Sequence, residues 1–217
     1  MTGNERPGTR ILGSLRSAAG RGVVRMEDRL DNDVADVWSA LTDPSRLSRW
    51  YGEVEGDLRL GGDYRARLLA SGWEGTGRVE ACEPRRRLLL VTRHVAAQDE
   101  GVIEVTLAAD GHLTNLAWEE RGMPLDYLAG YGAGIQVHVE DLTAHLAGRE
   151  RCDAEARFGE LFPAYQDLAA SLLRRQRGLY WLPDRCQPGE GHIGEEEDER
   201  EHDHRRAEHR QARRVDQ

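Results

Sequence analysis

The stretch GGDYRARLLASGWEGTGRVEA, residues 61–81, decides the fold because it holds a turn and two alternating segments. Gly61-Gly62 supplies the turn, since glycine readily adopts the positive φ angles that tight turns require. Apolar and charged side chains alternate over residues 64–68, and a second alternation runs over residues 73–81. A period of two is typical of strands with one buried face. The stretch therefore predicts two neighbouring strands of an antiparallel sheet.

Further strands are expected downstream of this pair. Apolar runs at residues 88–91 and 102–107 precede the hairpin signal Asp110-Gly111, and alternation resumes after it as far as Trp118. Tight turns separate all these segments. Five or six consecutive strands joined in this way form an antiparallel meander.

Helical patterns stand before and after the meander. A strand over residues 23–30 is followed by three candidate N-caps at 31–33 and by apolar residues at helical spacing. Pro44 suits the first turn of a short second helix. Apolar residues recur at helical spacing from 125 to 146, and Gly148 is expected to cap that long helix. We expect an α+β fold in which a curved antiparallel sheet of six or seven strands wraps the long helix, with two short helices after the first strand.

Composition divides the chain into four segments. Residues 1–22 are rich in Gly, Arg, Ser and Thr and are expected to be flexible. Residues 23–148 form the folded domain, and residues 149–186 form an amphipathic helical extension. Residues 187–217 are nearly all charged, histidine or glycine and are expected to be disordered, because they cannot bury enough apolar surface.

The extension carries a clean apolar stripe between residues 153 and 175. Its members are Phe158, Leu161, Phe162, Tyr165, Leu168 and Leu172. A stripe of this kind must be covered by its own domain, by a second copy in a homodimer, or by a partner protein. Pro163 lies inside the stripe and predicts a kink or two shorter helices.

Charge and cysteine spacing exclude several functions. The net charge of −9 argues against nucleic-acid binding, which needs a basic face. Cys82, Cys152 and Cys186 lie far apart and fit no metal or redox spacing, so we expect no metal or cofactor and a reducing compartment. No apolar run approaches the ~20 residues of a membrane span, and no secretory signal is evident, so a cytoplasmic location is expected.

The sequence also resembles a known family. Residues 37–50, VWSALTDPSRLSRW, resemble the opening of the SRPBCC superfamily in its AHSA-like branch (activator of heat-shock-protein ATPase homologues). Residues 57–65, DLRLGGDYR, match the glycine-pair segment of that branch, and residues 77–80 and 83–88 match its next strand and turn. The resemblance covers about residues 23–148. It implies a START-like helix-grip fold with a cavity between sheet and long helix, in which relatives carry lipids, hormones or polyketides, and it brings no shared catalytic motif.

Candidate ligand-binding residues are the bulky side chains on the predicted inward parity, with a few polar tips. They are Trp50, Tyr64, Trp73, Leu90, Trp118, Tyr131, Ile135 and His138. Such a lining is typical of a site for a small hydrophobic or aromatic molecule, although a packed core without a ligand would have the same pattern. Arg93 and Ile135 stand where many relatives carry tryptophan, so the pocket shape cannot be carried over from them.

Three functions remain open from the sequence. The chain is a binder of a small hydrophobic molecule, a protein-interaction or co-chaperone-like module acting through its surface and C-terminal helix, or a polyketide cyclase/aromatase-like enzyme. His138 could serve as a general base or be an ordinary buried histidine. His94 and Glu120 are expected to close their strands and line a mouth. No two residues form a recognisable catalytic pair, so no catalytic residue is assigned.

Two groups of glycines have alternative interpretations. Gly75 and Gly77 lie on the inward parity, where they leave room in a cavity or let the sheet bend. Gly130, Gly132 and Gly134 lie in the long helix, where each interior glycine costs ~1 kcal/mol relative to alanine. They therefore indicate close packing or a bend.

Overall fold

The computed structural model describes residues 10–95 and 100–179, with side chains up to residue 175. Eight strands and four α-helices lie in this part of the chain. Their bounds are β1 Gly13–Ala18, β2 Arg21–Leu30, α1 Val34–Thr42, α2 Pro44–Trp50, β3 Gly52–Gly56, β4 Asp63–Leu68, β5 Glu74–Glu83, β6 Arg87–His94, β7 Glu100–Asp110, β8 Leu113–Met123, α3 Leu128–Leu146 and α4 Ala154–Leu179. A single 3-10 turn, Leu125–Tyr127, leads from β8 into α3.

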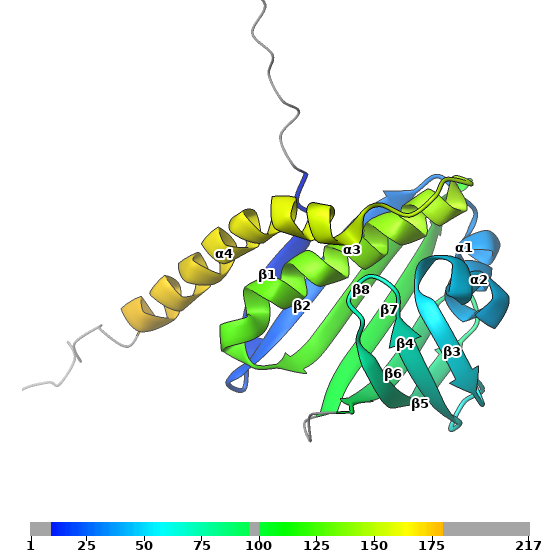
Figure 1. The fold of residues 1–217 in the computed structure, drawn as a ribbon, viewed down its shortest axis with the longest axis horizontal. Coiled ribbons are helices and arrows are strands. Elements are labelled where there is room, and N and C mark those ends of the chain that lie inside the picture. Colours follow the sequence, from blue (N-terminus) through cyan, green and yellow to red (C-terminus); the bar gives the residue numbers. More distant parts are fainter. Residues whose placement is uncertain (1–9, 96–99, 180–217) are drawn as a thin grey trace, which may run out of the picture. The chain divides into compact units, whose positions relative to one another are not determined.

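All eight strands form one antiparallel sheet in the order β1-β2-β8-β7-β6-β5-β4-β3. The sheet curls, and α3 lies along its concave side, with α4 beside α3 over β1 and α1 and α2 at the other end (Figure 1). The expected α+β helix-grip fold is confirmed. The meander accounts for β3 to β8, and each of its strands pairs with the next in sequence.

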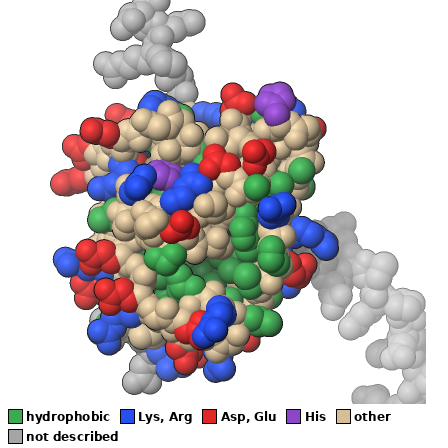
Figure 2. Space-filling view, turned by 90° about the vertical axis from the view of Figure 1, so that its right-hand side faces the viewer, with side chains coloured by type: hydrophobic (Ala, Val, Ile, Leu, Met, Phe, Trp, Pro, Cys, Tyr) green, Lys and Arg blue, Asp and Glu red, His purple; other side chains and the backbone are tan. Residues whose placement is uncertain are grey.

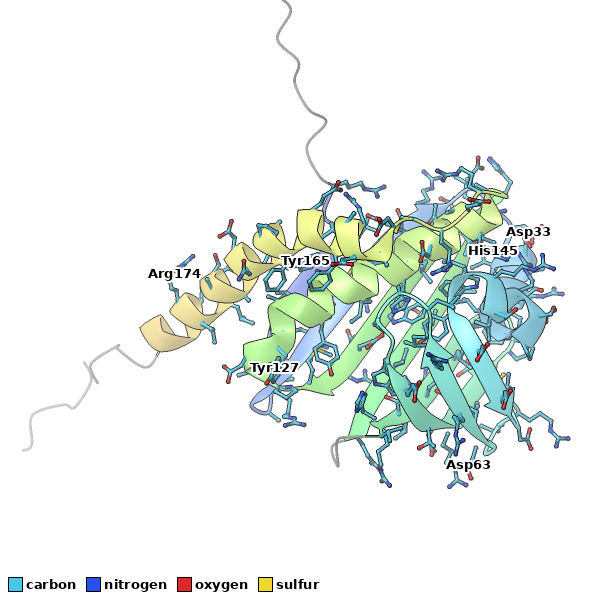
Figure 3. The ribbon with its side chains drawn as sticks, viewed as in Figure 1. Asp33, Asp63, Tyr127, His145, Tyr165 and Arg174 are labelled. Atoms are coloured by element: carbon cyan, nitrogen blue, oxygen red, sulfur yellow. The ribbon has the colours of Figure 1, made fainter. Side chains whose placement is uncertain are left out.

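Local signals place the two short helices. The carboxylate of Asp33, labelled in Figure 3, accepts the backbone N–H groups of Ala35 and Asp36 at 2.8 and 2.9 Å, so it is the N-cap of α1. Asp43 caps α2 in the same way, and Pro44 occupies its first turn. These caps fix where both helices begin, next to the open edge of the sheet that ends in β3.

The end of α3 also follows its sequence signal. Gly148 has φ +66°, a left-handed conformation that glycine adopts without strain. The N–H of Arg149 then donates to the carbonyl of Ala144 at 2.8 Å, which closes the last turn. The predicted glycine cap is confirmed.

The expectation of a flexible segment over residues 1–22 is wrong from residue 13 onward. Strand β1 pairs with β2 along its whole length and forms an edge of the sheet. Ala19 and Gly20 join the two strands with φ angles of +50° and +76°, the signs of a type I′ hairpin turn. The sheet therefore has eight strands instead of six or seven, and the two short helices follow its second strand.

Of the two outcomes expected at Pro163, the division into two shorter helices is wrong, because α4 is one continuous helix. Proline removes one helical hydrogen bond. Leu161 and Tyr165 flank it and are fully buried against the domain, so packing holds the helix on both sides of the proline. Residues 180–186 of the expected extension and the whole segment 187–217 lie outside the described residues.

Helix α4 packs beside α3 and over β1 (Figure 1), and its stripe residues Leu161 and Tyr165 are fully buried there. Of the three coverings expected for the stripe, the chain's own domain is the one observed at Leu161 and Tyr165. Leu168 and Leu173, nearer the helix end, stay 36% and 37% exposed. The extension is thus part of the domain's packing over its first half.

Candidate functional site

A cavity of about 960 Å³ lies between the concave side of the sheet and α3. All eight ligand-binding candidates border it: Trp50, Tyr64, Trp73, Leu90, Trp118, Tyr131, Ile135 and His138. Strand alternation brings the sheet residues to one face, and helical spacing does the same on α3. Their grouping around one space is observed, and their role in binding a ligand stays a prediction.

Of the four tryptophans that border the cavity, Trp50, Trp73 and Trp118 were predicted, and they contribute differently. Trp50 is fully buried, and its indole N–H donates to the carbonyl of Ala40 at 3.0 Å, so it fixes α2 against α1 and forms a rigid wall. Trp118 meets Trp50 edge-on at 6.4 Å between ring centroids. Trp73, which packs edge-on against His94 at 5.9 Å, is only half-buried. The part of the wall formed by Trp50 and Trp118 is therefore closely packed, while the part formed by Trp73 borders solvent.

The glycines of β5 do not create empty space. A Cβ atom on Gly77 would collide with the ring of Tyr64, its partner on β4, and one on Gly75 would collide with the ring of Trp73. Each glycine is thus covered by an aromatic ring, a common arrangement for strand glycines. The room that the sequence suggested at these positions is filled by the cavity's own aromatic wall.

Two glycines of α3 do leave the cavity open. Gly130 and Gly134 both border it, and a Cβ atom built on either would meet nothing within 4 Å. They are four residues apart and so lie on one face of the helix. Gly132, between them, faces the other way, where the ring of Tyr165 from α4 occupies the position of its missing side chain. Close packing therefore explains Gly132 alone.

The carboxyl group of Glu120 belongs to this mostly apolar wall. Glu120 lies in β8 with the same parity as Trp118, whose indole N–H donates to Glu120 Oε1 at 2.9 Å. Burial raises the pKa of Glu120 to about 7, against the opposing effect of that hydrogen bond. The residue lies three positions before the end of β8, so the expectation that it closes its strand is wrong. It stands in the wall of the cavity.

Three tyrosines approach Glu120 from three other elements. Tyr51 follows α2, Tyr64 belongs to β4 and Tyr131 to α3. Burial raises the pKa of all three hydroxyls, and the charge of Glu120 raises each further. Neutral hydroxyl groups therefore surround the carboxyl. Tyr131 is 40% exposed, which puts it at the rim.

His138 is a neutral member of the wall at physiological pH. Burial and the charge of Arg151 lower its pKa to about 4. Its ring meets that of Tyr51 edge-on at 5.2 Å, and its Nδ1 atom has no hydrogen-bond partner among the described residues. A buried nitrogen without a partner is costly, and the simpler interpretation of a satisfied histidine is not met at Nδ1 within the described residues. A role of His138 in binding stays a prediction.

Phe158 and Cys82 are among the wall residues that sequence reasoning missed. Phe158 of α4 borders the cavity and stacks on Phe162 at 5.3 Å, so the C-terminal extension helps to close the site. A bulge between Val79 and Ala81 shifts the register of β5, and Cys82 borders the cavity in place of Ala81. The apolar stripe of α4 indicated that Phe158 would be covered, but it did not predict that Phe158 would border the cavity. Nothing in the local sequence marks the bulge.

The hydrophobic groups gather in the middle of one face of the molecule, and charged side chains surround them (Figure 2). Among the described residues, no group of three or more His, Cys, Asp or Glu side chains could hold a metal ion. None of the described helices is long and apolar enough to cross a membrane. Besides its aromatic surface, the wall of the cavity includes the carboxyl of Glu120, the imidazole of His138 and the hydroxyls of Tyr51, Tyr64 and Tyr131 among its polar groups.

Solved structures with this architecture include one protein of a biosynthetic locus. The crystal structure of CalU16 from Micromonospora echinospora is 26% identical, with 73% of this chain and 96% of CalU16 covered and a TM-score of 0.60. DynU16, a protein of the dynemicin biosynthetic locus, is 27% identical, with 60% of this chain and 50% of DynU16 covered and a TM-score of 0.55. EF2215 from Enterococcus faecalis shares the fold at 17% identity, 74% and 91% coverage and a TM-score of 0.57.

Among curated proteins, none matches this chain. The model of the family described as "Activator of Hsp90 ATPase homolog 1-like protein" matches residues 31–147, from the N-cap region of α1 to the end of α3. That is more than half of the sequence, and it spans both short helices, six of the eight strands and the long helix. The chain belongs to this family, the AHSA-like branch of the helix-grip SRPBCC proteins.

Proposed function

We propose that this protein binds a small hydrophobic or aromatic molecule in the cavity between its sheet and α3. The observation that carries the proposal is the cavity itself, about 960 Å³ in volume and lined by aromatic and aliphatic side chains with few polar groups. Sites for small molecules have this size and composition. Its similarity to DynU16, a protein of a biosynthetic locus, agrees with a small-molecule ligand.

The open glycines support a functional reason for the space. Gly134 lies inside α3, where alanine would be more stable by ~1 kcal/mol. No neighbour within 4 Å would hinder a side chain there. Because no packing contact explains this loss of helix stability at Gly134, we infer that the space beside the glycine is kept open for a ligand.

The other functions have less support. A partner or a second copy at residues 153–175 would need an uncovered apolar stripe, and the chain's own domain buries the stripe at Leu161 and Tyr165. A cyclase-like reaction would need an acid–base pair within hydrogen-bond reach. Within the described residues, no hydrogen bond joins Glu120 to His138. Binding is therefore the function that the geometry supports best, and a cytoplasmic location stays a prediction.

Titration of the full chain with the neutral fluorescent probe 1-N-phenylnaphthylamine tests the proposal. We expect saturable binding to the wild type and a loss of about tenfold or more in affinity in Gly134→Leu, whose side chain fills the cavity. The matched control is Gly159→Leu, because Gly159 is also a helical glycine with nothing within 4 Å but lies exposed on α4. Its affinity should equal that of the wild type.

Two results would contradict the proposal. One is an absence of saturable probe binding to the wild type. The other is equal affinity of the two leucine variants, which would place the probe outside the cavity. Native mass spectrometry of the freshly purified protein gives independent evidence, because a co-purified molecule of constant mass should be present in the wild type and absent in Gly134→Leu.

A further inference from the structure

We propose that the ligand of this cavity carries a protonated amine on its apolar body, and that the carboxylate of Glu120 binds that amine. This inference rests on the proposed function and narrows it to one chemical class of ligand. It begins from the position of Glu120, which borders the cavity and lies on the inward face of β8 beside Trp118.

No positive charge of the described residues pairs with the carboxylate of Glu120. The groups that face Glu120 are Tyr51 after α2, Tyr64 on β4, Trp118 on its own strand and Tyr131 on α3. None of these side chains is cationic. A carboxylate in an apolar space without a cation is unfavourable, and it is stabilised strongly when a cation arrives.

The nearby basic residues are engaged elsewhere. Arg121, the next residue in β8, also borders the cavity, but its guanidinium pairs with Glu104 at 2.9 Å and with Glu119 at 3.0 Å. Arg21 of β2 acts on Tyr131, whose pKa it lowers in part. His138 is neutral at physiological pH because burial lowers its pKa. Among the described residues, no protein cation therefore reaches the Glu120 carboxylate.

Aromatic rings form the cavity surface near the carboxyl of Glu120. The ring of Tyr51 lies 5.9 Å from that of Trp118 and 5.1 Å from that of Trp50, measured between centroids. Aromatic faces attract cations, and tryptophan does so most strongly. A carboxylate among tyrosine and tryptophan rings is therefore suited to an ammonium group, whereas it would repel an anionic ligand.

The carboxylate of Glu120 can accept further hydrogen bonds besides the one from Trp118. The indole of Trp118 donates to Oε1 of Glu120 and so favours the ionised form, while burial favours the neutral form. An ammonium group at Oε2 would add to the first effect. The volume of the cavity leaves room for an apolar body on the amine. An alkylamine or arylalkylamine therefore suits both the carboxylate of Glu120 and the apolar surface of the wall.

Isothermal titration calorimetry with 4-phenylbutylamine and the isosteric alcohol 4-phenylbutan-1-ol tests the inference on the full chain. We expect the amine to bind about tenfold or more tightly than the alcohol at pH 8, an advantage within the range measured for buried charge pairs. Affinity for the amine should rise from pH 6 to pH 8 as Glu120 ionises, since the amine stays protonated over that range. Affinity for the alcohol should not change with pH.

Glu120→Gln should abolish both the advantage of the amine and its pH dependence, while keeping the size of the side chain. Glu119→Gln is the matched control, because Glu119 is the neighbouring carboxylate of β8 but pairs with Arg16 at 3.0 Å on the outer face. It should behave like the wild type. The pH dependence of the unmodified protein gives a second readout that requires no variant to fold.

The outcomes separate this inference from the proposed function. If the alcohol and 1-N-phenylnaphthylamine bind but the amine has no advantage, or if Glu120→Gln keeps that advantage, the amine inference is overturned and the binding function stands. An alcohol that binds more tightly at low pH than the amine would show that Glu120 acts as a neutral donor. If none of the three probes binds, the proposed function fails and the inference fails with it.

Discussion

Helix α3 presents two faces that differ in how completely they are packed. Toward α4 and β1, Gly132 receives the ring of Tyr165, and Gln136 has a hydrogen-bond partner for both its amide oxygen and its amide nitrogen. Toward the sheet, Gly130 and Gly134 lie under open space. The same helix is therefore closely packed on one side and hollow on the other.

The polar groups of the two faces differ in the same way. Glu140, on the packed side, accepts two hydrogen bonds from Arg157 at 2.7 and 2.8 Å and one from Gln136, which together lower its pKa although burial opposes them. On the hollow side, Nδ1 of His138 has no partner in the described part of the chain, and Glu120 across the cavity accepts one hydrogen bond, from Trp118. Incomplete satisfaction of His138 and Glu120 is expected of a binding site. Outside the cavity, Oδ2 of Asp141 on α3 also has no hydrogen-bond partner among the described residues.

The largest expected effect tests the packed face. Tyr165→Ala should lower the free energy of unfolding by about 4 kcal/mol, because a fully buried aromatic ring and its hydroxyl hydrogen bonds are lost. Figure 3 shows Tyr165 at the contact of α4 with α3. The control is Tyr131→Ala on the hollow side, where a rim residue should cost about 1 kcal/mol. Equal losses of unfolding free energy in the two variants, measured by urea denaturation, would show that the two faces of α3 are packed alike.

The two cavity groups should give pH dependences of opposite sign. Glu120 has a folded pKa of about 7, above its unfolded value, so it contributes stability at low pH that is lost as the pH rises through 7. His138 has a folded pKa of about 4, below its unfolded value, so its contribution is lost as the pH falls from about 6.5 to 4. Each change is worth roughly 3 kcal/mol by linkage.

Stability curves of variants measure these contributions. Relative to the wild type, Glu120→Gln should gain stability as the pH rises from 4.5 to 8, and His138→Gln should gain it as the pH falls from 6.5 to 4. The free energy of unfolding is obtained from urea denaturation at each pH. Curves that run parallel to the wild type would show that neither group is shifted by the cavity.

Alanine substitutions at Gly132 and Gly134 test directly whether the two faces of α3 differ in packing. Gly134→Ala should stabilise the protein by ~1 kcal/mol, since alanine is the better helix former and the space is open. Gly132→Ala should destabilise it by about 1–2 kcal/mol, because the ring of Tyr165 must move. Thermal melting of the two variants should therefore shift in opposite directions. Shifts of the same sign would mean that the two faces are packed alike.

The smallest expected effect concerns the ion pair at the edge of the packed face. Arg157→Met should cost about 1 kcal/mol, because the pair with Glu140 is bidentate and mostly shielded from solvent. Arg174→Met on the same helix is the control, since this exposed arginine, labelled in Figure 3, donates only to Ser171 among the described residues. A measurable loss in the control would indicate a general effect of charge on α4.

Much of the candidate site was predictable from periodicity. Alternation in β4 put Tyr64 on the inner face, and helical spacing in α3 put Ile135 and His138 on the side of the sheet. The same alternation in β8 places Glu120 with Trp118, although its position near a presumed strand end disguised it. These residues were identifiable because strands and helices fix side-chain direction locally.

By itself, the sequence determined the antiparallel meander, the capped helices and the inward parity, because these follow from local dihedral preferences and from the side-chain periods of strand and helix. It did not reveal β1, since this strand has few apolar residues and its turn carries Ala19 at positive φ. Only the tertiary structure decided which glycines are filled and which are open, because a glycine carries no side chain to mark its neighbour. The tertiary structure also decided that no cation of the described residues pairs with Glu120, because charge pairing depends on distances between elements far apart in the chain.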